Sequence, residues 1–229
     1  MGDDRFAKLD NPAWWALTGI QHSFSEGTTH IKRYRRGVLS FAAYTYEMPE
    51  NLHALDEWLV AGEIFYLIGK LPPLPAQWEL LKELPCAQMI IETPVTIAGK
   101  AVPISPLNAF HSTSMFNLIN KVQPGYYEPG TRLLGNYYGI WQQDKLVAIA
   151  GERMRMEQLT EISAICTDPG YTGQKYAQHL AAHLCNTNLA QGNIPFLHVL
   201  QTNTRAIRLY EYLGFTHRRS ISFWQLQKK

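Results

Sequence analysis

The sequence predicts an α/β protein with a mixed sheet, and three features of its second half carry that prediction. Residues 160–167 form a short apolar run rich in β-branched residues, which is typical of a buried strand. From residue 176 the apolar positions take helical spacing and share one stripe: Tyr176, Ala177, Leu180, Ala181 and Leu184. A second apolar run follows at residues 196–200, so strands and helices alternate.

Composition sets limits on the function. The chain has 229 residues, of which 46% are hydrophobic and 17% charged, enough apolar material for one large or two small domains. The net charge of +2 is too small to indicate nucleic acid or an anionic membrane by itself. The first ten residues are polar and acidic, and no apolar run approaches about 20 residues. We therefore expect a soluble, cytoplasmic protein with no membrane partner.

Cysteine and histidine spacing gives no sign of a metal site. The three cysteines have no metal-like spacing, and we expect buried, reduced thiols at Cys86, Cys166 and Cys185. His179 and His183 are four residues apart on the predicted helix and could chelate a metal, but no third ligand is near them in the sequence. We expect packing or surface histidines and no metal.

We expect a first domain at residues 1–103, with a boundary in the Gly- and Pro-containing segment 94–106. Strands are predicted at residues 31–46, 62–71 and 88–92, and a short helix at 52–59. A helix is also predicted after the proline-rich turn at 71–75, because Trp78, Leu81 and Leu84 would share one face. This half carries no phosphate loop.

One basic cluster lies at the start of this half. It consists of Lys32, Arg33, Arg35 and Arg36, interleaved with Tyr34, and could contact nucleic acid or phosphate. The alternative is a solvated strand end, which the nearly neutral net charge favours.

The second domain, residues 104–229, is predicted to begin with a helix at 107–122. A hairpin turning at residues 143–145 comes next, and then the strand at 160–167. Asp168-Pro169-Gly170 has turn chemistry, and a loop leads from it into the helix that starts near residue 176. The first amides of such a helix lack partners and point along the helix dipole, so the sequence predicts an anion site there, most often a phosphate site.

Two motifs in this half resemble the GNAT superfamily of acetyl-CoA-dependent N-acetyltransferases. The loop 172–177 is similar to the pattern Q/R-x-x-G-x-G/A; Ala177 fits, whereas Thr172 replaces the usual Gln or Arg and Lys175 the usual inner Gly. Downstream, the strand at 196–200, Asn203 and the segment 206–215, which ends in Leu-Gly-Phe, resemble the closing section of the same superfamily. With the hairpin, the resemblance covers about residues 105–229 and is nearest to the FR47-like branch.

The resemblance implies a GNAT fold and acetyl transfer from acetyl-CoA directly to a primary amine of a small molecule, such as an amino acid or an amine. It places the carbonyl-binding backbone amide at Ile165, on a strand that a bulge would splay. The residues implied in acetyl-CoA binding are Ile165, Cys166, Thr167, Thr172, Gly173, Gln174, Lys175, Tyr176, Ala177, Asn203 and Ala206. Asn203 could also cap the last helix.

The resemblance also suggests catalytic residues. Tyr210 occupies the position of a tyrosine that protonates the leaving thiolate; the alternative is a core aromatic. Glu161 is the candidate base, acting through water; the alternatives are a surface carboxylate or a partner of Arg153 or Arg155. Glu152 is a competing base.

The loop after residue 125 commonly shapes the acceptor pocket in this superfamily, which makes Tyr126, Tyr127 and Arg132 candidate acceptor contacts; the alternative is packing aromatics and a surface cation.

Other functions stay open. The altered loop is compatible with a non-catalytic CoA-binding or regulatory protein, and the acceptor could be a protein. We expect no nucleic-acid partner, a homodimer is compatible with the sequence, and the first half could be a degenerate copy of the second.

Overall fold

The computed structural model describes residues 4–229. The first half contains α1 (Pro12–Thr18), β1 (Ser25–Gly27), β2 (Ile31–Tyr34), β3 (Phe41–Tyr44), β4 (Ile64–Ile68) and β5 (Trp78–Ile90). The second half contains β6 (Ser105–Leu107), α2 (Ser112–Val122), β7 (Tyr137–Gln142), β8 (Lys145–Met156), β9 (Leu159–Thr167), α3 (Tyr176–Ala190), β10 (Ile194–Leu200), α4 (Thr204–Tyr212) and β11 (Thr216–Lys228). Short 3-10 helices are η1 (Asp4–Asp10), η2 (His22–Phe24), η3 (Pro49–Glu57), η4 (Ala109–His111), η5 (Thr131–Leu134) and η6 (Pro169–Tyr171).

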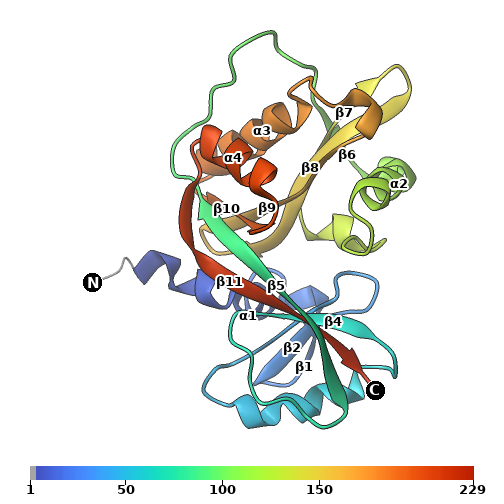
Figure 1. Cartoon of the computed structure of the whole chain (residues 1–229), viewed down its shortest axis with the longest axis vertical. Helices are drawn as coiled ribbons and strands as arrows, with labels where there is room; N and C mark the ends of the chain where they lie inside the picture. Colours follow the sequence, from blue (N-terminus) through green and yellow to red (C-terminus); the bar gives the residue numbers. More distant parts are fainter. Residues whose placement is uncertain (1–3) are drawn as a thin grey trace.

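All the strands belong to one mixed sheet, which confirms the predicted fold class. Their order is β1-β2-β3-β4-β11-β5-β10-β9-β8-β7-β6. The strand β5 lies between β10 and β11 and is antiparallel to both, while β11 pairs on its other edge with β4. Figure 1 shows the long strands β5 and β11 running between two parts of the molecule. One part carries α2, α3 and α4, and the other carries β1 to β4. The two halves of the chain therefore complete one another's sheet.

The predicted boundary segment 94–106 falls in the connection between β5 and β6. Because β5 is an inner strand of the sheet beside β10, this connection does not separate two independent sheets. The division of the chain into two domains, and the origin of the first half as a degenerate copy, stay predictions.

The prediction of a helix after the proline-rich turn is wrong, because residues 78–90 form the strand β5. Trp78 and Leu84 are buried, but Leu81 is 41% exposed, so the three residues do not share a face. Pro85 lies inside the segment, and proline is unfavourable within a helix. The single strand predicted at 31–46 is also corrected. It is two antiparallel strands, β2 and β3.

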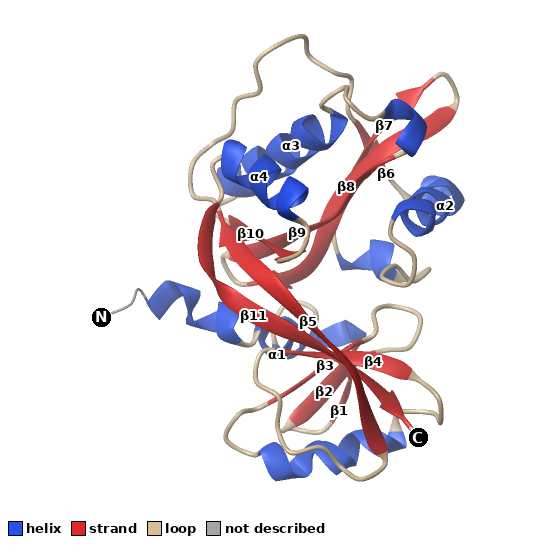
Figure 2. Ribbon diagram, in the orientation of Figure 1, coloured by secondary structure: helices blue, strands red, loops and turns tan. Residues whose placement is uncertain are grey.

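Helices cover both faces of the sheet around β7 to β10 (Figure 2). On one face α3 packs through Leu180 and Leu184 against Ala150 and Leu197. On the other face α2, which begins at Ser112 and not at 107, contributes Met115 and other apolar residues to a cluster with β7, β8 and β9. The strands that carry the site are thus covered by helices on both faces of the sheet.

The three cysteines are buried and unpaired, as predicted. Burial raises the pKa of each of these thiols to about 12, so they stay protonated near neutral pH. Among the helices of residues 4–229, none is long and apolar enough to cross a membrane.

Candidate active site

The site starts where β9 and β10 separate. These parallel strands pair only from Ile194 opposite Leu159 to Phe196 opposite Glu161. Beyond that point β9 continues along β8, and β10 continues along β5. The bulge expected at Ile165 is present in β9, because Ile149 and Gly151 of β8 pair with Cys166 and Ser163, and the intervening Ala164 has a φ of 52°. The backbone edge of β9 that faces the gap is therefore free to pair with a ligand.

A loop of free amides follows directly from β9. Asp168 fixes the turn by accepting from the Gly170 N–H at 3.0 Å and by ion pairs with Lys121 and Lys145 at 3.0 and 2.9 Å. Within the described chain, the backbone N–H groups of residues 173–178 donate no hydrogen bond, as expected at the start of a helix. The fifteen-residue helix α3 adds its dipole. The loop can therefore hold an anion such as a pyrophosphate.

Lys175 takes the conformation that a glycine would take most easily. It has φ 59° and ψ 16°, in the left-handed region, and it precedes the first residue of α3. For a residue with a side chain this conformation costs about 1–2 kcal/mol. Lys175 in place of the usual glycine thus introduces backbone strain into the loop, while the amides of the loop donate no hydrogen bond within the described chain.

A cavity of about 540 Å³ lies next to the gap between β9 and β10. It brings together six of the predicted site residues: Tyr126, Tyr127, Ile165, Asn203, Ala206 and Tyr210. The side chain of Cys166 is instead in the apolar cluster under α2, and Arg132 lies half-buried in η5 outside the lining. Tyr176 is buried, and its hydroxyl hydrogen-bonds to Gln142 and Gln174. Only the backbones of Cys166 and Tyr176 can serve a cofactor.

Tyr210 has the properties of a proton donor. It lies on α4, whose start is capped by Asn203 as expected, with Oδ1 accepting from the Ala206 N–H at 3.1 Å. The Tyr210 ring packs edge-on against Phe215, with ring centroids 5.7 Å apart, and its hydroxyl has no partner in the described chain. Burial raises the pKa of Tyr210 above its ordinary value, so the hydroxyl keeps its proton.

Glu161 is the partner of Arg153, one of the alternatives that the sequence left open. Its two oxygens accept from Arg153 Nε at 2.8 Å and Nη2 at 2.6 Å, and Oε1 also accepts from His198 Nδ1 at 2.7 Å. Burial raises the pKa of Glu161, but Arg153 and the hydrogen bonds lower it more, to about 2. Glu161 is buried and is not part of the cavity lining, so Arg153 and His198 stand between this carboxylate and the cavity.

Glu152 is also committed to structure. It is buried, and it accepts from the Asn136 N–H at 2.9 Å and from Asn188 Nδ2 at 2.9 Å. Asn188 lies on α3, so Glu152 ties that helix to β8. Neither candidate base faces the cavity.

His198 and Tyr137 were not predicted as site residues, and Arg153 was predicted only as an ion-pair partner; all three line the cavity. His198 Nε2 lies 3.0 Å from Gln88 Nε2, and Gln88 is fixed because its Nε2 also donates to the Leu9 carbonyl and its Oε1 accepts from Arg218. This network assigns the His198 proton to Nδ1. The available signal was a histidine and an arginine inside apolar strands.

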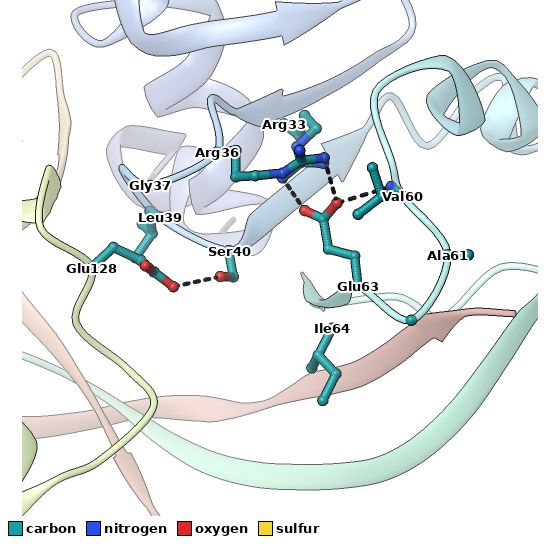
Figure 3. Close-up of a pocket in the computed structure, with 11 residues that line it drawn as sticks. Arg33, Arg36, Gly37, Leu39, Ser40, Val60, Ala61, Glu63, Ile64 and Glu128 are labelled. Carbon is teal, nitrogen blue, oxygen red and sulfur yellow. Dashed lines mark hydrogen bonds and ion pairs between the residues drawn. The ribbon is translucent and has the colours of Figure 1, made fainter.

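The basic cluster of the first half is not a free patch. Arg33 is buried and donates to the Trp58 carbonyl at 2.6 Å. Figure 3 shows that both arginines bind Glu63: Arg33 Nη2 lies 2.5 Å from one carboxylate oxygen, and Arg36 Nη2 lies 3.0 Å from the other. Glu63 therefore pairs with two of the four cations, and Arg33 is buried and not on a solvated strand end. The absence of a nucleic-acid partner stays a prediction.

His179 and His183 do not form a metal site with any third group. His183 packs edge-on against Tyr138, with ring centroids 4.4 Å apart. Within residues 4–229, no group of three His, Cys, Asp or Glu side chains could hold a metal ion.

Comparisons with known proteins agree with this geometry. The model of the family described as FR47-like protein matches residues 137–224. A GNAT-family acetyltransferase structure from Novosphingobium aromaticivorans DSM 12444 is 30% identical, with a TM-score of 0.88, over 96% of this chain and 98% of that chain. No curated protein matches the chain.

Two further structures share the fold. The GCN5-related N-acetyltransferase from Kribbella flavida is 13% identical, with a TM-score of 0.64, over 94% of both chains. A GCN5-related N-acetyltransferase-like protein from Streptococcus suis 89/1591 is 14% identical, with a TM-score of 0.61, over 96% of this chain and 97% of that chain. The resemblance seen at residues 105–229 thus extends to nearly the whole chain, and the protein belongs to the GNAT family of acetyltransferases, with an FR47-like segment at residues 137–224.

Proposed function

We propose that the protein transfers the acetyl group of acetyl-CoA directly to the primary amine of a small molecule. One observation carries the proposal: a single cavity is lined both by candidate acetyl-CoA contacts, such as Ile165 and Tyr210, and by candidate acceptor contacts, Tyr126 and Tyr127. Because donor and acceptor groups share one space, the amine can attack without a covalent enzyme intermediate.

The residues present fit acetyl-CoA. The free amides of residues 173–178 suit its pyrophosphate, and the unpaired edge of β9 beyond Glu161 suits the amide groups of its pantetheine arm. Asn203 uses Oδ1 for the helix cap, so its Nδ2 can donate to the same arm. When bound, acetyl-CoA supplies an acetyl group activated as a thioester.

The reaction needs two proton transfers, one to the leaving thiolate and one from the attacking amine. Tyr210 keeps its proton and lines the cavity, so we assign it the protonation of the leaving thiolate. Among the described lining residues none is Asp or Glu. We therefore propose that the amine loses its proton to water, and that Glu161 acts indirectly by holding Arg153 and His198.

The test is an assay of released CoA thiol with a panel of small amines and with peptides bearing free N-termini. Acetylation of small amines supports the proposal, and kcat/KM should rise with pH until the pKa of the amine itself is reached. Acetylation of peptides alone would favour a protein N-acetyltransferase. Acetyl-CoA binding with no acceptor turned over would favour a non-catalytic CoA-binding protein.

A further inference from the structure

Two buried hydroxyls in the cavity lack hydrogen-bond partners. Tyr127 is 6% exposed and Tyr137 is 3% exposed, both line the cavity, and neither hydroxyl has a partner. Buried hydroxyls are nearly always hydrogen-bonded in folded proteins. The pair therefore points to a ligand that supplies the missing partner.

The fold places these hydroxyls in one cavity with the half-buried cation of Arg153. Tyr137 of β7 lies opposite Gly151 of β8, where an added Cβ would come within 2.2 Å of the tyrosine ring. The Tyr127 ring packs edge-on against Tyr137, with centroids 5.9 Å apart. Arg153 lies two residues beyond Gly151 on β8 and lines the same cavity as both tyrosines. Tyr127, Tyr137 and Arg153 together form what we call the donor wall.

Two of the three guanidinium nitrogens of Arg153 are hydrogen-bonded, and Nη1 is left without a partner in the described chain. Its Nε and Nη2 bind Glu161, and its guanidinium lies over the Phe41 ring at 4.8 Å from the centroid. Within the described chain Nη1 donates no hydrogen bond. A guanidinium can only donate, so this nitrogen can donate to an acceptor bound in the cavity.

The chemistry of the donor wall favours an anion. Burial raises the pKa of Tyr137 well above its ordinary value, so its hydroxyl keeps the proton and can donate. The described lining contains no Asp or Glu that would attract an ammonium group. Much of the remaining lining is apolar or aromatic, including Phe41, Leu84, Ile119 and Phe223. The cavity therefore suits an apolar body with one acidic group.

We propose that the donor wall binds the carboxylate of the acceptor, so that the acceptor is an amine carrying a carboxylate on an apolar body, as in an apolar amino acid. The inference rests on the proposed acetyl transfer. The carboxylate accepts from both tyrosine hydroxyls and from Arg153 Nη1, which leaves the amine to face the acetyl-CoA side of the cavity.

The test compares matched acceptors and conservative variants. Each of alanine, leucine and phenylalanine is assayed beside its amide and its decarboxylated amine. The wild type should prefer the carboxylate form in kcat/KM by at least about 10-fold. Tyr137→Phe and Tyr127→Phe should each lower kcat/KM for that form by about 10- to 100-fold, chiefly through KM, as expected for loss of a hydrogen bond to a charged group. For the two forms without a carboxylate, kcat/KM should change by less than about threefold.

Tyr138→Phe is the control, because Tyr138 is the next residue on β7 and packs on the other face against His183. Arg153 is not substituted, since its loss would leave Glu161 buried without a cation. Calorimetric binding of the amino acids is measured in parallel for the wild type and Tyr137→Phe.

Equal kcat/KM for the carboxylate and decarboxylated forms would overturn the carboxylate site and leave acetyl transfer standing. So would a Tyr137→Phe variant that keeps the wild-type preference. Amino-acid binding that depends on Tyr137, without turnover of any amine, would support the site and reject the proposed function. Absence of both binding and turnover would reject both.

Discussion

Replacing Glu161 by glutamine should lower the free energy of unfolding at pH 7 by about 3–5 kcal/mol, the usual cost of removing one partner of a buried ion pair. The glutamine keeps the size of the side chain and an acceptor for His198. Arg153, however, has a side chain only 13% exposed and would lose its counter-charge. The perturbation therefore tests whether this pair anchors the wall of the cavity.

The same pair predicts how stability depends on pH. Burial alone would raise the pKa of Glu161, but Arg153 and His198 lower it from 4.5 to about 2. A carboxyl group with a lowered pKa stabilises the fold above its unfolded-state pKa, and this contribution is lost as the pH falls from 4.5 towards 2. At about 1.4 kcal/mol for each pH unit, the contribution is on the order of 3 kcal/mol.

Urea unfolding, followed by tryptophan fluorescence at pH 7, 5 and 3, measures both effects. The wild type should lose stability between pH 5 and 3, whereas Glu161→Gln should begin lower and lose less over that interval. Glu157→Gln is the control, because Glu157 is 78% exposed in its pair with Lys8 and should change stability by no more than about 0.5 kcal/mol. A Glu161→Gln variant as stable as the wild type at pH 7, with the same pH dependence, would show that the pair of Glu161 and Arg153 does not stabilise the fold.

Three further substitutions test other parts of the site. Tyr210→Phe should lower kcat by on the order of 100-fold with little change in the Kd for acetyl-CoA, as expected for loss of a general acid; calorimetry and steady-state kinetics measure the two, and unchanged kcat would remove Tyr210 as the acid. Lys175→Gly should relieve the left-handed strain and raise stability by up to about 1 kcal/mol, while acetyl-CoA affinity stays within about threefold because backbone amides bind the phosphates; lost affinity would assign binding to the lysine side chain. Gly151→Ala should displace the Tyr137 ring and lower stability by about 1–3 kcal/mol with a higher KM for the acceptor; an unchanged melting temperature and KM would contradict the packing described.

The elements that could be predicted from the sequence are those set by local patterns. The turn at Asp168, the helix α3 and the strands β9 and β10 each follow from spacing within about ten residues, and the structure confirms them. The strand β5 could not be recognised in the same way. Its burial is set by β10 and β11, which lie more than a hundred residues further along the chain, and Trp78, Leu81 and Leu84 have helical spacing by coincidence.

The parts of the candidate site that depend on backbone geometry could be predicted from the sequence. The hydrogen-bond and ion-pair partners of its side chains could not be predicted as well. The bulge next to Ile165 and the cap by Asn203 are both present. The partner of Glu161 depends on a bulged hairpin that presents Arg153 and on a parallel strand that presents His198. Tyr137 gave no signal, because a tyrosine in an apolar strand is ordinary and its unpartnered hydroxyl is evident only in three dimensions.

The most direct test of the proposed acetyl-CoA site is isothermal titration of the purified protein with acetyl-CoA, with CoA and ATP as controls. We predict saturable binding in the micromolar range for acetyl-CoA and CoA and much weaker binding of ATP, because the cavity and the edge of β9 are suited to the part of the ligand that ATP lacks. No binding of acetyl-CoA at millimolar concentration would show that the loop with Lys175 has lost its ligand, and it would contradict the proposed acetyl transfer.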